Sequence, residues 1–146
     1  MTQVSKYPLR KEIEKRMFEV FLDSVAMVTT RNKVMKLLTD LLSPTEQTML
    51  AKRLAIALLL TKKYDQRSVM GVLKVSLGTV NKINRALKNG SGGYDMVISS
   101  MIKQEKFQEF IDKLDDALTE LLVMGRKVPT LRQKHWEEKR ERQKPF

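Results

Sequence analysis

The chain of 146 residues has no cysteine, one histidine, one tryptophan and four prolines. Without cysteine it can form neither a disulfide nor a thiolate metal site, and the single His135 argues against histidine-based metal or triad chemistry. The longest apolar run, Leu54 to Leu60, is too short to span a bilayer, and no signal-peptide pattern opens the chain. We therefore expect a cytoplasmic protein without a cofactor, a metal or a membrane partner.

Features typical of enzymes are also missing. Carboxylates are plentiful, but they fall on helical surface positions, and no nucleophile–base pair is visible. The glycine-containing segment at 91–93 follows an expected helix rather than a strand, so it indicates a connector and not a phosphate-binding loop. No segment has the alternation of a strand. The sequence predicts an all-α protein that is not an enzyme.

The net charge of +11 is unevenly distributed. Between Lys62 and Gly90 there are seven basic residues and one acidic residue, a net charge of +6. Between Arg126 and Phe146 there are eight basic and three acidic residues, a net charge of +5, and the remaining segments cancel. Two segments thus carry the whole excess, which favours a polyanionic partner. The alternative is a surface charge that only keeps the protein soluble.

Three helices are expected in the first half of the chain. Pro8 suits a first turn, and the apolar residues between Leu9 and Val28 recur every three or four positions. A second helix starts at Thr29 or Thr30 and runs to about Leu42. The segment Ser43-Pro44-Thr45-Glu46 is a capping box with proline at the first helical position, and it predicts a third helix that continues to about Lys63.

Two shorter helices are expected next, at 66–73 and 77–88. Asp65 and Ser76 are their N-caps. Asn89 and Gly90 end the second of them, because both residues tolerate the left-handed conformation. Further on, apolar residues from Val97 to Ile102 indicate another helix, which could continue to Met124. The second half of that helix has a heptad-like stripe, formed by Phe107, Ile111, Leu114, Leu118 and Leu121.

The two short helices have the pattern of a helix-turn-helix, whose second helix enters the major groove of DNA. Val69 and Leu73 on the first helix can meet Val80, Ile83 and Leu87 on the second, with Val75 in the turn. One detail is unfavourable, since Lys74 stands where the turn usually has glycine. A left-handed residue there costs on the order of 1 kcal/mol. The alternative is an ordinary helix pair in a bundle.

Leu77 and several small polar or basic side chains are left on the outer edge of the second helix. Asn81 suits adenine, while Lys82 or Arg85 suits guanine or phosphate, and Gly78 allows a close approach of the backbone. Gln66 and Arg67 would lie over a phosphate strand. The complete set of expected DNA-binding residues is Gln66, Arg67, Ser76, Gly78, Thr79, Asn81, Lys82, Arg85 and Lys88.

The sequence resembles the Trp repressor superfamily, especially its YerC/YecD-like branch. The resemblance lies in LLSPTEQTMLAKRLAIALLL and DQRSVMGVLKVSLGTVNKINRALKNGSGGYDMVISSM, and it covers roughly residues 35–102. It implies an intertwined all-α homodimer that binds double-stranded DNA, with Gln66, Arg67, Thr79 and Lys88 at operator-contact positions. We accordingly expect a helix-turn-helix domain at 8–102, an extension helix at 103–125 and a basic, flexible tail at 126–146.

In the Trp repressor proper, free tryptophan binds beside the recognition helix. Ser43 and Arg53 match two positions of that pocket. However, Lys82 replaces an arginine that stacks on the indole, and Ile83 replaces a glycine that leaves room for it. We therefore expect that tryptophan is not the effector, and that any small-molecule effector is doubtful.

Three functions remain open at this point. The leading hypothesis is a sequence-specific transcriptional repressor. The second is a nucleoid-associated or replication-related protein that binds DNA with little sequence preference, and the third is a protein–protein interaction bundle. In the first two, the basic tail is a further candidate for contact with the DNA backbone or a minor groove.

Overall fold

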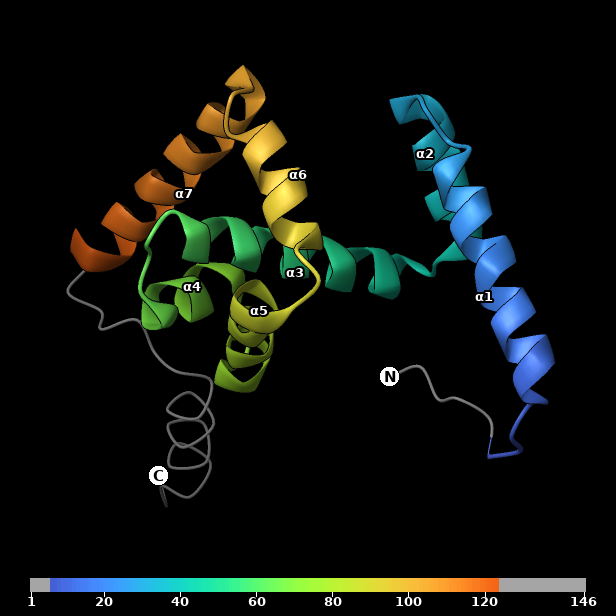
Figure 1. Cartoon of the computed structure of the whole chain (residues 1–146). Helices are drawn as coiled ribbons and strands as arrows, with labels where there is room; N and C mark the ends of the chain where they lie inside the picture. Colours follow the sequence, from blue (N-terminus) through green and yellow to red (C-terminus); the bar gives the residue numbers. More distant parts are fainter. Residues whose placement is uncertain (1–5, 124–146) are drawn as a thin grey trace, which may run out of the picture. The chain divides into compact units, whose positions relative to one another are not determined.

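The computed structural model describes residues 6–123, which form seven helices (Figure 1). These residues contain no strand, in agreement with the predicted all-α class. The chain divides into two compact units between Gln47 and Thr48. The helices are α1 (Lys11–Ala26), α2 (Arg31–Leu41), α3 (Pro44–Thr61), α4 (Gln66–Leu73), α5 (Leu77–Asn89), α6 (Gly93–Met101) and α7 (Glu105–Val123). No helix among the described residues is both long and apolar enough to cross a bilayer.

Expected caps start α2 and α3, whereas α1 has Arg10 at its N-cap position and no side-chain cap. Pro8 therefore precedes α1, although the sequence had suggested that it lies in the first turn. The hydroxyl of Thr30 accepts a hydrogen bond from the Lys33 amide at 3.3 Å, which identifies Thr30 as the start of α2. In the predicted capping box, the amide of Glu46 donates to Ser43 Oγ at 3.2 Å, and the Ser43 amide donates to Glu46 Oε2 at 2.7 Å. Hydrogen bonding to the backbone amide of Ser43, and also to its side chain, favours the ionised carboxylate and lowers the pKa of Glu46.

The first unit has helices but no core of its own. Neither α1 nor α2 contains a buried residue, although both helices are amphipathic. Phe18 is 59% exposed and Phe21 44%, with their ring centroids 6.2 Å apart. Met17, Val20, Leu22, Val25, Met35 and Leu38 are likewise exposed. Exposed apolar side chains in this number, on one face of each helix, need another surface to pack against, and the first unit does not provide one.

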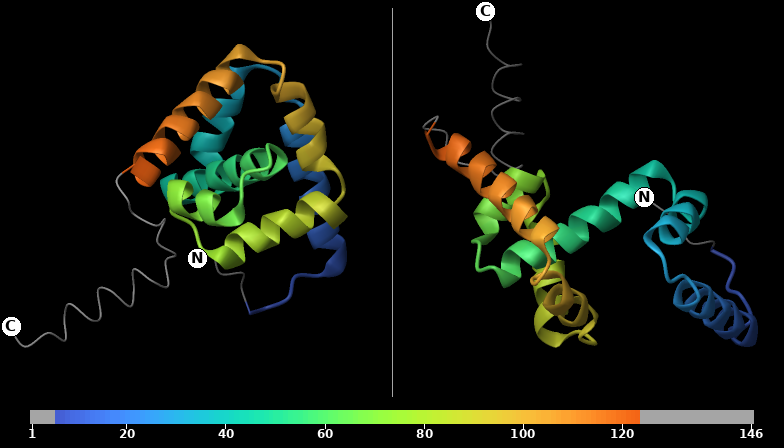
Figure 2. Two further views of the ribbon diagram at one scale, coloured as in Figure 1. Left: turned by 90° about the vertical axis from the view of Figure 1, so that its left-hand side faces the viewer. Right: turned by 90° about the horizontal axis from the view of Figure 1, so that it is seen from above.

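The second unit has a continuous hydrophobic core around the end of α3. Its buried members are Ile56, Ala57, Leu58, Leu59, Val69, Met70, Val75, Val80, Ile83, Ile98, Phe107 and Ile111. Each of the five helices α3 to α7 contributes to it. α4 packs against α5 and α7, and the two views of Figure 2 show α4 and α7 side by side. Residues 66–89 are thus held within a folded core.

Two expectations for this unit need correction. The helix that could have continued from Val97 to Met124 is broken into α6 and α7 by a turn, in which the Gln104 amide donates to the Met101 carbonyl at 2.9 Å. The break allows residues of both helices to face one core. The second correction concerns Gly90, which ends α5 in an extended conformation and not a left-handed one.

Glycine is nevertheless required at the end of α5. A Cβ atom at Gly90 would clash with the carbonyl oxygen of Ala86. The left-handed residue of this loop is Gly92, with φ of 86°. The expected end of the extension helix at residue 125 and the basic tail at 126–146 lie outside the described residues.

Candidate nucleic-acid interface

α4 begins at a side-chain cap, as predicted. Asp65 Oδ2 accepts a hydrogen bond from the Ser68 amide at 3.1 Å, and Asp65 Oδ1 accepts one from Ser68 Oγ at 2.6 Å. These hydrogen bonds from Ser68 lower the pKa of Asp65, because they favour its ionised form. The cap holds Gln66 and Arg67 in the first turn of α4.

The turn between α4 and α5 has the geometry that the helix-turn-helix pattern requires. Lys74 has φ of 55° and ψ of 54°, so a residue with a side chain occupies the left-handed conformation expected there. The amide of Val75 then donates to the Met70 carbonyl at 3.3 Å, which closes the end of α4, and Val75 is buried below the turn. The left-handed conformation at Lys74 and the place of Val75 in the turn are thus both confirmed.

α5 starts at the predicted N-cap and turns its apolar face inward. Ser76 Oγ accepts a hydrogen bond from the Thr79 amide at 3.2 Å and lies 2.9 Å from Thr79 Oγ1. Val80 and Ile83 are buried in the same core as Val69 of α4, while Leu73 and Leu87 pack against that core from its edge. These are the apolar positions predicted for the junction of the two helices.

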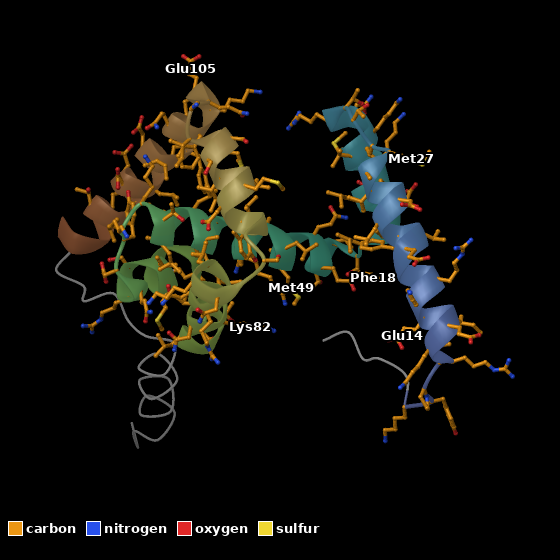
Figure 3. The ribbon with its side chains drawn as sticks, in the orientation of Figure 1. Glu14, Phe18, Met27, Met49, Lys82 and Glu105 are labelled. Carbon is orange, nitrogen blue, oxygen red and sulfur yellow. The ribbon has the colours of Figure 1, made fainter. Side chains whose placement is uncertain are left out.

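The polar residues of the pair remain accessible. None of the nine expected DNA-binding residues is buried. Gln66, Thr79 and Asn81 are half-buried, while Arg67, Ser76, Gly78, Lys82, Arg85 and Lys88 are exposed. Figure 3 shows the Lys82 side chain reaching away from the α5 ribbon. The outer face of α5 therefore remains accessible and carries polar and basic side chains.

The cations of this surface have no carboxylate partner within residues 6–123. Among residues 6–123 the single ion pair joins Arg16 and Glu19, at 3.5 Å. Arg67, Lys82 and Arg85 are consequently not neutralised by neighbouring acids. Cations without an acidic neighbour along one helix pair create a positive potential, which attracts a polyanion. Their side chains are also available for contacts with phosphate groups.

One residue of this surface was not among the expected contacts. Leu77, the first residue of α5, is 47% exposed and is the single large apolar side chain of α4 and α5 that is exposed to that degree. It lies between Ser76 and Gly78 at the end of the helix that would face base edges. Its exposed position between polar residues could have indicated a contact with a base methyl group.

The two residues of the expected effector pocket fall in different compact units, Ser43 in the first and Arg53 in the second. Within the second unit, an open apolar hollow of about 470 Å³ occurs where α5 ends and α6 begins, and its walls include Leu54, Ala86 and Tyr94 but not Arg53. Ser43 is instead part of the capping box of α3.

The comparison with known families agrees with this geometry. The family model described as "Trp repressor protein" matches residues 16–102, which is more than half of the chain. The match includes α2 to α6 in full and most of α1, while α7 lies beyond it. No curated protein and no solved structure matches the chain.

Proposed function

The chain belongs to the Trp repressor family and is thus a DNA-binding regulator with a helix-turn-helix, and we propose that it is a cytoplasmic repressor that binds a specific operator as a homodimer. The single observation that carries the proposal is the outer face of α4 and α5, where nine polar or small residues are accessible and the cations form no ion pair with any described residue. Occupation of the operator would exclude the polymerase.

Each part of this surface has a proposed role. Asn81 reads adenine, and Lys82 or Arg85 reads guanine or contacts phosphate. Gln66 and Arg67 at the start of α4 contact the phosphate strand, together with Lys88. Thr79, Ser76 and Gly78 form the close approach at the N-terminal end of α5.

The exposed apolar face of the first unit supports the homodimer. A helix pair without a buried residue cannot offset the conformational entropy that its folding costs. A second copy of the chain offers the same apolar face and would cover it in a symmetric interface. The two recognition helices would then meet half-sites about one helical turn apart, on the order of 34–36 Å.

We also propose that tryptophan is not the effector, as in the YerC/YecD-like branch. Ile83 is 4% exposed and is part of the core beneath α5. Its side chain fills space that a glycine would leave open, so the recognition helix is supported without a ligand. Calorimetric titration with tryptophan should give no binding, and a micromolar dissociation constant would contradict the proposal.

Selection of bound oligonucleotides from a random pool tests the repressor proposal. We expect an enriched sequence with two-fold symmetry, bound roughly 10³-fold or more tightly than random DNA. A pool that shows no enrichment but still binds would favour the nucleoid-associated alternative, and no binding at low salt would refute both.

Charge reversal then tests the surface. Lys82→Glu and Arg85→Glu should abolish binding to the selected site, and Lys113→Glu on the exposed face of α7 is the matched control. The two α5 variants should remain folded, because their side chains are exposed. Equal affinities for all three variants would mean that α5 does not face the duplex, and would refute the proposed DNA-binding surface.

A further inference from the structure

α7 lies beyond the family match and yet contributes to the core of the helix-turn-helix. Phe107 is 4% exposed and Ile111 is 7% exposed, and both belong to the cluster that contains Val69 of α4 and Val80 of α5. Leu114 packs against this cluster from its edge. The heptad-like stripe of α7 is therefore used, at least in its first half, within the same chain.

The helix that α7 supports cannot be stable alone. α4 has eight residues, and isolated helices of this length are not stable in water because nucleation is costly. α5 and α7 are the helices against which α4 packs most closely. Removal of either one would expose apolar residues of α4, Val69 and Met70 among them.

Polar contacts join α7 to the segment that leads into α4. The hydroxyl of Tyr64, one residue before the Asp65 cap, donates a hydrogen bond to Asp115 Oδ1. Burial, this hydrogen bond and the charges of Asp115 and Asp112 raise the pKa of Tyr64 to about 12, so the phenol stays a neutral donor. Two residues earlier, Lys62 Nζ lies 5.5 Å from the ring centroid of Phe107.

We propose that α7 is a positioning element for the helix-turn-helix, which holds α4 in the orientation that presents α5 to DNA. Phe107 and Ile111 are the positioning residues of its core contact, and Asp115 fixes the entry to α4 through Tyr64. Undocking of α7 would lower the affinity for DNA without removing any residue that touches it. The inference rests on the proposed function. It adds that the orientation of the recognition helix is set by α7 within the same chain, without a ligand.

The test compares two phenylalanines of the same helix. Phe107→Ala removes a buried ring, whereas Phe110→Ala removes a ring that is 36% exposed and outside the core cluster. Phe107→Leu should restore most of the contact. Affinity for the selected oligonucleotide is measured at a temperature at which circular dichroism shows every variant to be helical, and amide hydrogen exchange is followed for α4 and α5.

We expect Phe107→Ala to bind at least ~10-fold more weakly, since the apparent affinity falls with the fraction of molecules in the competent conformation. Because no phosphate contact is lost, the dependence of affinity on salt should keep the slope of the unaltered protein. Amides of α4 should lose protection first. Phe110→Ala and Phe107→Leu should stay close to the unaltered protein in each measurement.

Unaltered affinity of a helical Phe107→Ala variant would overturn the proposal. If the unaltered protein selects no DNA, the proposed function is refuted, but the role of α7 is still tested by hydrogen exchange. Equal protection of the α4 amides in Phe107→Ala and Phe110→Ala would refute that role. If Phe107→Ala does not fold, Tyr64→Phe takes its place, with a loss of affinity of roughly five-fold expected from one hydrogen bond. An unchanged affinity of Tyr64→Phe would then refute the positioning role.

Discussion

Replacement of Gly78 by alanine should affect stability and DNA binding in opposite directions. Gly78 is the second residue of α5 and is exposed at the proposed duplex surface. A Cβ atom built there would have Ser76 Oγ as its nearest neighbour, at 3.9 Å, which is an ordinary van der Waals contact. Its φ is not positive. Nothing in the part of the chain that the structure describes therefore requires glycine at this position.

The magnitude of the stability change follows from helix propensity. Alanine within a helix is more favourable than glycine by roughly 0.5–1 kcal/mol, so Gly78→Ala should stabilise the fold by up to that amount. For a domain of this size such a gain raises the melting temperature by about 2–8 °C. Against DNA, the added methyl group would stand between the backbone of α5 and the bases, and we expect the affinity to fall by at least about ten-fold, or roughly 1.4 kcal/mol.

Gly93→Ala is the matched control. Gly93 is the first residue of α6, a Cβ atom there would have no neighbour within 4 Å, and it lies outside the proposed surface. Thermal unfolding should show both variants to be as stable as the unaltered protein or more so. Binding titrations with the selected oligonucleotide should show a loss for Gly78→Ala alone. If Gly78→Ala binds as tightly as Gly93→Ala, the duplex does not approach the backbone at Gly78.

Further predictions concern single features of the same surface and of the tail. Lys74→Gly should stabilise the protein by roughly 0.5–1 kcal/mol, because glycine adopts the left-handed conformation without the penalty of a side chain, and Lys74→Ala should give no such gain in urea unfolding. The lowered pKa of Asp65 means that its carboxylate stabilises the fold above the ordinary value of 3.8, and that this contribution is lost as the pH falls through the lowered value. The urea midpoint of the unaltered protein should thus fall relative to that of Asp65→Asn only below about pH 4. A difference between the two midpoints that does not change with pH would refute the role of the Asp65 carboxylate as a cap. Leu77→Ala should lose any preference for thymine over uracil at one position of each half-site, since the uracil probe lacks the methyl group that a leucine would contact. Truncation after Gly125 should make the log–log dependence of affinity on salt shallower by about 0.9 per lost phosphate contact, and an unchanged slope would show that the tail does not touch DNA.

Local features of the fold could be predicted because their causes are local. A cap requires an acceptor side chain three residues before an amide, and Ser43, Asp65 and Ser76 were recognisable as caps from sequence alone. The inward positions of α4 and α5 followed from the helical period. The left-handed conformation of Lys74 was predictable from its place in the helix-turn-helix, where glycine is usual, despite the energetic penalty at a lysine.

Features that depend on distant residues could not be predicted. Tyr64 and Asp115 are separated by 51 positions, and nothing in either segment indicates the other. The break between α6 and α7 arises because Ile98 and Phe107 share one core, whereas each segment by itself is a good helix. The end of α5 was predicted at the right residue for the wrong reason, since Gly90 is needed for a close approach to Ala86 and not for a positive φ.

The surface that covers α1 and α2 could be predicted only in part. The period of their apolar residues predicted both helices and the side that should be covered, but a period does not contain the identity of the covering surface. Burial would have to come from elsewhere, since Phe18, Phe21 and Met17 remain exposed and neither helix has a buried residue. If a second copy provides it, folding of the first unit and association of the chains are one equilibrium. The melting temperature must then rise with protein concentration, and a value independent of concentration in the micromolar range would exclude the homodimer.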